Sequence, residues 1–237
     1  MVVAGTIRAM SDTRTEEIEA TLRRIEEMSA AGEHPSLGTL GFWRAVGAVK
    51  RDPVLIDRFA DRIGAIDQAA FTEWARLTVP MWLGTAFAMI ATFVGLGLVA
   101  LAYGRDPRTG AVLFLAGTGV LLGSTHGLGH LLYGWSVGMR FTVWFVGRGR
   151  PQPGVKTDYA SYLRTPARRR AWMHASGAIV TKAVPFVLLP SAIIAGIAGW
   201  ATALLVVLGV AQLVTDVVWS TKSSDWAKFR REMKYAQ

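Results

Sequence analysis

The chain has 237 residues, of which 51% are hydrophobic and only 18% are charged, and it contains no cysteine. The hydrophobic content exceeds that of an ordinary soluble domain, and it is concentrated in four long blocks after residue 79. These features exclude an ordinary soluble globular enzyme and also a disordered chain, which would be polar. Without cysteine there is no disulfide scaffold, iron–sulfur cluster or thiolate zinc site, so a bound metal would need His, Asp or Glu ligands.

The first 78 residues are polar, with ten basic and twelve acidic side chains. The pattern predicts a helix over 13–31 that stops at Gly32, a short helix within 37–50, and a longer helix that starts at Asp52. The longer helix carries an apolar stripe at three- and four-residue spacing, made of Ile56, Phe59, Ile63, Ile66, Ala70 and Trp74. We interpret 1–78 as a small helical cytoplasmic module. It packs either on itself alone or also on the membrane domain or another subunit.

Each of the four later apolar blocks has roughly the 20 residues that a helix needs to cross a bilayer. They are expected at about 80–104, 110–138, 175–194 and 198–220. Eight Lys and Arg residues lie in the loop 139–173, and five lie in the tail 221–237. The positive-inside rule then places this loop, the basic tail and both termini in the cytoplasm. The sequence thus predicts an all-α integral membrane protein with four transmembrane helices, located as a multi-pass protein in the plasma (inner) membrane.

The positive charge of the second part of the chain lies between apolar blocks, which is a topology signal rather than a nucleic-acid-binding surface. No nucleic-acid partner is expected. The expected partners are the membrane, other transmembrane proteins or subunits, and anionic lipid headgroups, which attract basic clusters beside a span. Within the basic loop, 142–146 alternates weakly and is a candidate strand. In the tail, 225–231 is typical of a basic interfacial helix.

Two histidines, His126 and His130, lie four residues apart in the second expected span. On a helix this spacing places both imidazoles on one face, where they can bind one ion. Ionisable groups inside a span are costly and usually functional. Asp216 is the only acidic residue within the four expected spans. We therefore predict a metal site made of His126, His130 and Asp216. The alternative is a protonated Asp216, or a pair between Asp216 and a basic group such as Lys182.

Two other polar residues are associated with the third expected span, one at its cytoplasmic mouth and one within it. His174 follows three consecutive arginines and is either an interfacial histidine or a residue beside the metal site. Lys182 lies two turns deeper, and we expect it to extend toward the surface or to pair with Asp216. Two His and one Asp with an open position suit zinc best, although iron would also bind.

The stretch 126–130, His-Gly-Leu-Gly-His, with Gly-Met-Arg at 138–140, resembles the H-E-x-G-H region of the site-2 protease family of intramembrane zinc metalloproteases. Segment 175–181 stands where that family has an A-G-P-x-x-N motif. Residues 215–216 stand where it has L-D-G with its zinc-binding Asp. The resemblance covers about residues 110–222 and does not include the amino-terminal module.

This resemblance implies a zinc cofactor bound by His126, His130 and Asp216. It also makes Thr181, which stands at the position of the family's Asn, a candidate for contact with substrate or with the metal ligands. One departure concerns the chemistry directly. Gly127 stands where the family has its catalytic Glu, the general base that activates water at the zinc. Glycine cannot serve as a base, so no catalytic residue is assigned.

The resemblance and its departure together favour a metal-binding, catalytically impaired pseudoprotease that binds or regulates partner transmembrane helices. One alternative is an active intramembrane zinc metalloprotease with a non-standard base. Another is an accessory or scaffold subunit of a larger membrane complex, which could bind haem or another cofactor through a histidine. Glycines along the second expected span permit close helix packing and agree with tight assembly.

Overall fold

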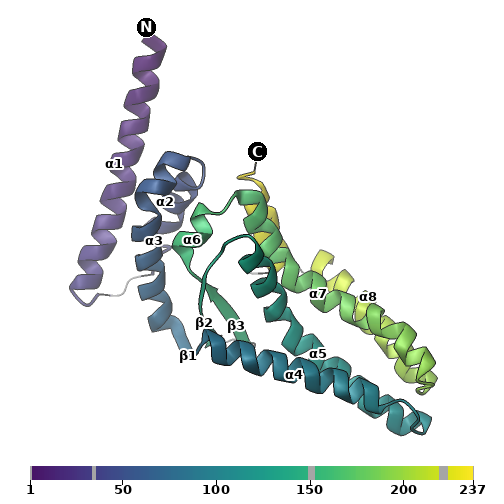
Figure 1. The fold of residues 1–237 in the computed structure, drawn as a ribbon. Coiled ribbons are helices and arrows are strands. Elements are labelled where there is room, and N and C mark those ends of the chain that lie inside the picture. Colours follow the sequence, from purple (N-terminus) through teal and green to yellow (C-terminus); the bar gives the residue numbers. More distant parts are fainter. Residues whose placement is uncertain (1, 34–35, 149–152, 219–223, 237) are drawn as a thin grey trace.

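The computed structural model describes residues 2–33, 36–148, 153–218 and 224–236, without the side chains of 2–12, 216 and 217. The structure is 76% helical. Among the described residues, the helices are α1 (Val2–Ala30), α2 (Phe42–Val49), α3 (Pro53–Trp74), α4 (Met81–Leu101), α5 (Pro107–Ser136), α6 (Tyr159–Arg164), α7 (Ala167–Ile194), α8 (Gly199–Val218) and α9 (Asp225–Met233). The strands are β1 (Ala75–Pro80), β2 (Phe141–Gly147) and β3 (Pro153–Thr157). Figure 1 shows α4, α5, α7 and α8 extending together at one end of the molecule, with α1–α3 at the other end.

Helices α1–α3, here called the amino-terminal module, agree with the predicted helices in number. The predicted start of α1 was wrong, because the helix begins at Val2 rather than at residue 13. No proline interrupts residues 2–12, so the helix can extend through them. The predicted end was right. Gly32 adopts φ +77°, a left-handed conformation that glycine takes without strain. Helix α3 begins as predicted, with the Asp52 carboxylate accepting a 2.9 Å hydrogen bond from the Val54 amide.

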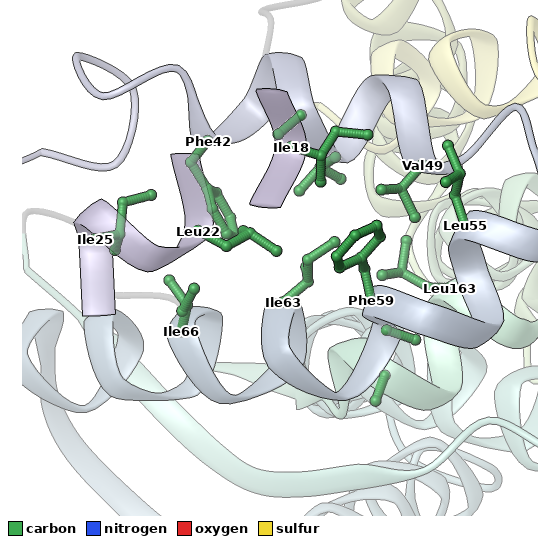
Figure 2. Close-up of a cluster of buried hydrophobic side chains, with 14 residues drawn as sticks. Ile18, Leu22, Ile25, Phe42, Val49, Leu55, Phe59, Ile63, Ile66 and Leu163 are labelled. Atoms are coloured by element: carbon green, nitrogen blue, oxygen red, sulfur yellow. The ribbon is translucent and has the colours of Figure 1, made fainter. Parts of the chain in front are cut away.

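The amino-terminal module has its own hydrophobic core, shown in Figure 2. Phe59, Ile63 and Ile66 of the predicted stripe are buried in it, opposite residues of α1 and α2. The core also includes Ala160 and Leu163 of α6. The module therefore packs both on itself and on the segment that precedes α7.

Three of the described helices, α4, α5 and α7, are long and apolar enough to cross a membrane. The fourth predicted span corresponds to α8, whose apolar part, Gly199–Thr215, is shorter. Crossing of the membrane by α8 stays a prediction.

Small residues set the helix crossings. A Cβ atom at Gly117 on α5 would lie 2.6 Å from the carbonyl oxygen of Gly95 on α4, so these backbones approach as closely as glycine allows.

The predicted all-α class holds for the helical majority but omitted a small antiparallel sheet of order β1-β2-β3. The candidate strand at 142–146 is confirmed as the central strand, β2. Strand β1 pairs with it through Val79 and Trp144, and β3 pairs with it through Val155 and Trp144. Strand β1 also joins α3 directly to α4. The sheet therefore lies between the amino-terminal module and the apolar helices, where Figure 1 shows it.

Candidate metal centre

Helix α5 presents His126 and His130 on one face, as their four-residue spacing predicts. Their Nε2 atoms lie 3.3 Å apart. Helix α7 packs against this face at very short range, because glycines stand at the contact. A Cβ atom at Gly129 would lie 3.0 Å from the Cα atom of Gly177, and a Cβ atom at Gly177 would lie 2.5 Å from Nε2 of His130. The two histidines thus occupy space that only a glycine at 177 leaves open.

Helix α7 also determines which ring nitrogen of each histidine carries a proton. His130 Nδ1 lies 2.7 Å from the Met173 carbonyl oxygen, which can only accept, so Nδ1 donates. His126 Nδ1 lies 3.0 Å from the Thr181 hydroxyl oxygen. That hydroxyl donates to the Gly177 carbonyl oxygen at 2.8 Å, so it accepts from His126. We therefore assign both neutral rings a lone pair on Nε2, the tautomer of a metal-binding histidine held by an outer hydrogen bond.

The third group of the site is Asp225, the first residue of α9. Its Oδ2 atom lies 3.2 Å from His126 Nε2 and 3.4 Å from His130 Nε2. Its other oxygen, Oδ1, accepts a 3.1 Å bond from Lys228 one turn later. The preceding residue, Ser224, caps α9 by accepting from the Ala227 amide. Asp225 is held from both sides, with one oxygen aimed at the histidines.

Three acceptor atoms therefore converge on one point, a donor set that suits a cation. Nε2 of His126, Nε2 of His130 and Oδ2 of Asp225 are separated from one another by 3.2–3.4 Å. Zinc bound by nitrogen and oxygen at about 2.0–2.2 Å in a tetrahedron requires ligand atoms about 3.3–3.6 Å apart. The observed triangle fits this requirement. These residues could hold a metal ion.

A proton competes with a metal for the same point. Burial by itself raises the pKa of Asp225, but the hydrogen bonds from His126 and His130 outweigh burial and hold this pKa well below its usual range. Such a bond requires a proton on Nε2 in addition to the one on Nδ1, which makes the ring a cation, and a metal ion would take the position of that second proton. Metal binding at this triangle would release that proton.

A cavity of about 650 Å³ opens beside the triangle. Its walls come from α5, α7, α8, α9 and the sheet, with Phe145 and Val155 on the sheet side. The volume is typical of a small-molecule or peptide site. Of the described residues that line this cavity, Asp225 is the only one with a carboxylate.

The remaining candidates from the sequence lie around this cavity in different roles. Thr181 touches the site through the Nδ1 atom of His126. His174 lines the cavity, and its Nε2 atom lies 2.9 Å from the Tyr162 hydroxyl. Lys182 lines the cavity as well. The side chain of Asp216, the predicted third ligand, lies outside the described residues, so its ligation and its pairing with Lys182 stay predictions.

The space beside Gly127 is filled by Trp144 of β2. A Cβ atom at position 127 would lie 2.4 Å from Cη2 of this indole. A Cβ atom at Gly84 of α4 would lie 2.3 Å from Cγ, at the opposite end of the same indole. Trp144 is buried, and its Nε1 atom donates to the Thr85 hydroxyl at 3.2 Å. Any larger side chain at 127, including glutamate, would have to displace a buried tryptophan that packs against glycine backbone at both ends of its indole.

Sequence reasoning missed Asp225, which it assigned only to a basic tail helix. A local signal existed, because Ser224 and Asp225 form a good helix start with an acidic first turn. That signal locates a helix end and gives no information on which distant side chains it meets. No family model matches the chain, and no match is found among curated proteins or among solved structures.

Proposed function

We propose that the protein is a zinc-binding membrane protein of site-2-protease type that binds partner transmembrane segments without cleaving them. The observation that carries this proposal is the convergence of His126, His130 and Asp225 within 3.2–3.4 Å, with both histidines oriented through Nδ1. Zinc in such a site acts as a Lewis acid that polarises a carbonyl group and activates water.

The non-cleaving part of the proposal rests on the missing base. Hydrolysis at such a site needs a group that takes a proton from water, and loss of a general base typically costs about 10²–10⁴ in rate. Gly127 has no side chain, and Trp144 occupies the space into which a glutamate would extend. Among the described residues that line the cavity, the one carboxylate belongs to the metal triangle itself. Within the described part of the cavity, the chain's groups can bind and orient a ligand but offer no second carboxylate that could act as a base.

Partner binding is supported by the cavity and by its surroundings. The cavity lies between the sheet and apolar helices, so a segment of another membrane protein could enter beside the metal triangle. Metal bound there would give an additional polar anchor for a carbonyl group of that segment. The protein would then retain a client near the membrane and leave its chain intact.

Metal content tests the binding part of the proposal and decides between the two aspartates. Detergent-purified protein should contain about one zinc per chain by elemental analysis. The variant Asp225→Asn should lose it, as should His126→Ala, while the matched variant Asp216→Asn should retain it. Retention in Asp225→Asn with loss in Asp216→Asn would assign the third ligand to α8 instead. Absence of zinc, and of zinc binding after dialysis, from the natural chain would refute metal binding.

Cleavage is tested separately with tagged single-span membrane proteins co-expressed with the chain. We expect co-purification of intact partners and no zinc-dependent fragments. Fragments that disappear in His126→Ala would favour the alternative, an active protease. In that event His174→Gln should be examined first, because His174 is the remaining histidine among the described residues that line the cavity.

A further inference from the structure

The metal triangle depends on α9, a short helix whose two ends make very different contacts. Asp225 and Glu232 are seven residues apart, which is close to two full turns, so they lie on the same face about 10 Å apart along the axis. That face packs on α7, where the rings of Phe229 and Trp172 are 5.3 Å apart. A displacement of the Glu232 end would therefore move or tilt the Asp225 end.

Glu232 is a buried anion between two buried cations. Its side chain is 2% exposed. Oε1 accepts a 2.5 Å bond from Lys50 Nζ, and Oε2 accepts a 2.8 Å bond from Arg170 Nε. Arg170 also donates to the carbonyl oxygens of Leu163 and Thr165. Buried charges persist in proteins only where partners of this kind surround them, so a displacement of α9 would leave these charges buried without their partners.

Lys50 brings the amino-terminal module to this cluster. It is the residue that follows α2, and it crosses to the carboxyl end of the chain. Three aromatic rings surround its Nζ atom, from Tyr159, Tyr162 and Tyr235, with centroids 5.1–5.8 Å away. These rings favour a cation at this point and restrict where the ammonium group can lie. The ion pair thus joins elements separated by 182 residues.

We propose that Lys50 and Glu232 are positioning residues of the metal centre. Their ion pair holds α9 so that Asp225 meets His126 and His130, and the amino-terminal module thereby controls metal affinity from a distance. This inference rests on the proposed metal binding and adds its regulation. A partner that pulls the amino-terminal module away from α9 would weaken the metal site without touching a ligand.

The test uses the full chain in detergent, titrated with cobalt as a spectroscopic substitute for zinc. Lys50→Met should weaken cobalt binding by about tenfold, in the range found when partners of metal ligands are removed. It should also alter the ligand-field bands, because Asp225 no longer holds its place. Lys50→Arg should restore affinity and bands. The control Asp61→Asn breaks another contact of the same module, the exposed pair with Arg164, and should leave both unchanged.

Hydrogen exchange at 225–233 provides a second readout that requires no metal. The amides of α9 should exchange faster in Lys50→Met than in the natural chain. The inference would be overturned if Lys50→Met bound cobalt with the natural affinity, showed the natural ligand-field bands and exchanged its α9 amides at the natural rate. That result would leave the proposed metal binding intact. If the natural chain binds no metal, the proposed function fails, and faster exchange alone then decides whether Lys50 holds α9. Should Lys50→Met not fold, Lys50→Gln replaces it, because it removes the ion pair and can retain only a neutral hydrogen bond to Glu232; weaker cobalt binding and faster exchange of α9 are again expected, and natural-like values in both would overturn the inference.

Discussion

Substitution of Gly127 by alanine should destabilise the protein through one contact. The added Cβ atom would lie 2.4 Å from Cη2 of Trp144, whereas carbon atoms in contact are normally about 3.5–4.0 Å apart. The indole would have to move by more than about 1 Å. Its movement is restricted, because the backbone of Gly84 lies against the opposite end of the ring system. Overpacking of this kind lowers the free energy of unfolding by about 1–3 kcal/mol. For a chain of this length, that corresponds to a thermal midpoint lower by about 2–12 °C.

A double-mutant cycle isolates this contact from other effects of the substitution. In the Trp144→Ala background, the methyl group of Gly127→Ala has room. The substitution should then raise the free energy of unfolding by about 0.5–1 kcal/mol, because alanine is the better helix former. The coupling energy between the two positions should then be about 1.5–4 kcal/mol. Thermal unfolding of the four proteins in one detergent measures it. A coupling below about 0.5 kcal/mol would refute the reasoning that Trp144 excludes a side chain at 127.

The cycle also bears on catalysis. Gly127→Glu alone would be expected to misfold or to displace the indole, so its failure to cleave a substrate would carry no information about ancestry. Gly127→Glu in the Trp144→Ala background provides the space for a base. If only this double variant gained zinc-dependent cleavage, Gly127 and Trp144 together would account for the lack of activity.

Two further outcomes follow from the structure. Gly177→Ala should weaken zinc binding by at least tenfold, because its Cβ atom would lie 2.5 Å from Nε2 of His130. The control is Gly119→Ala, whose Cβ atom meets nothing within 4 Å and which should bind zinc like the natural chain. Elemental analysis and competition with a chelator measure both variants. Glu232→Gln should lower the free energy of unfolding by about 3–5 kcal/mol at neutral pH, since it leaves Lys50 buried beside a second cation, Arg170. Burial by itself raises the pKa of Glu232, but the neighbouring cations Lys50 and Arg170 outweigh burial and hold this pKa below its usual range. The stabilisation is therefore complete above about pH 4.5 and is lost as the pH falls through the lower folded-state value. The difference in thermal midpoint between the natural chain and Glu232→Gln should shrink on acidification, and a constant difference down to pH 3 would contradict this.

The helical elements were predictable because they depend on neighbours in the sequence. Asp52 before a proline starts α3, Gly32 ends α1, and long apolar runs form α4, α5 and α7. The strands were harder, because only 142–146 alternates, and weakly. Strand β1 contains the polar residues Arg76 and Thr78 and was assigned to the end of the amino-terminal module. Its hydrogen bonds come from β2, more than 60 residues later, and no local pattern encodes that pairing.

The candidate site also has a part that was predictable from the sequence and a part that was not. The sequence by itself determined that His126 and His130 face one point, because helical periodicity requires it, and that residue 127 has no base, because it is glycine. Only the tertiary structure decided that Asp225 meets these histidines and that an indole fills the space beside Gly127. It also decided that Lys50 reaches the other end of α9. These are contacts between distant segments. They depend on how whole helices pack, and the packing of buried side chains is a property of the assembled fold rather than of any local pattern.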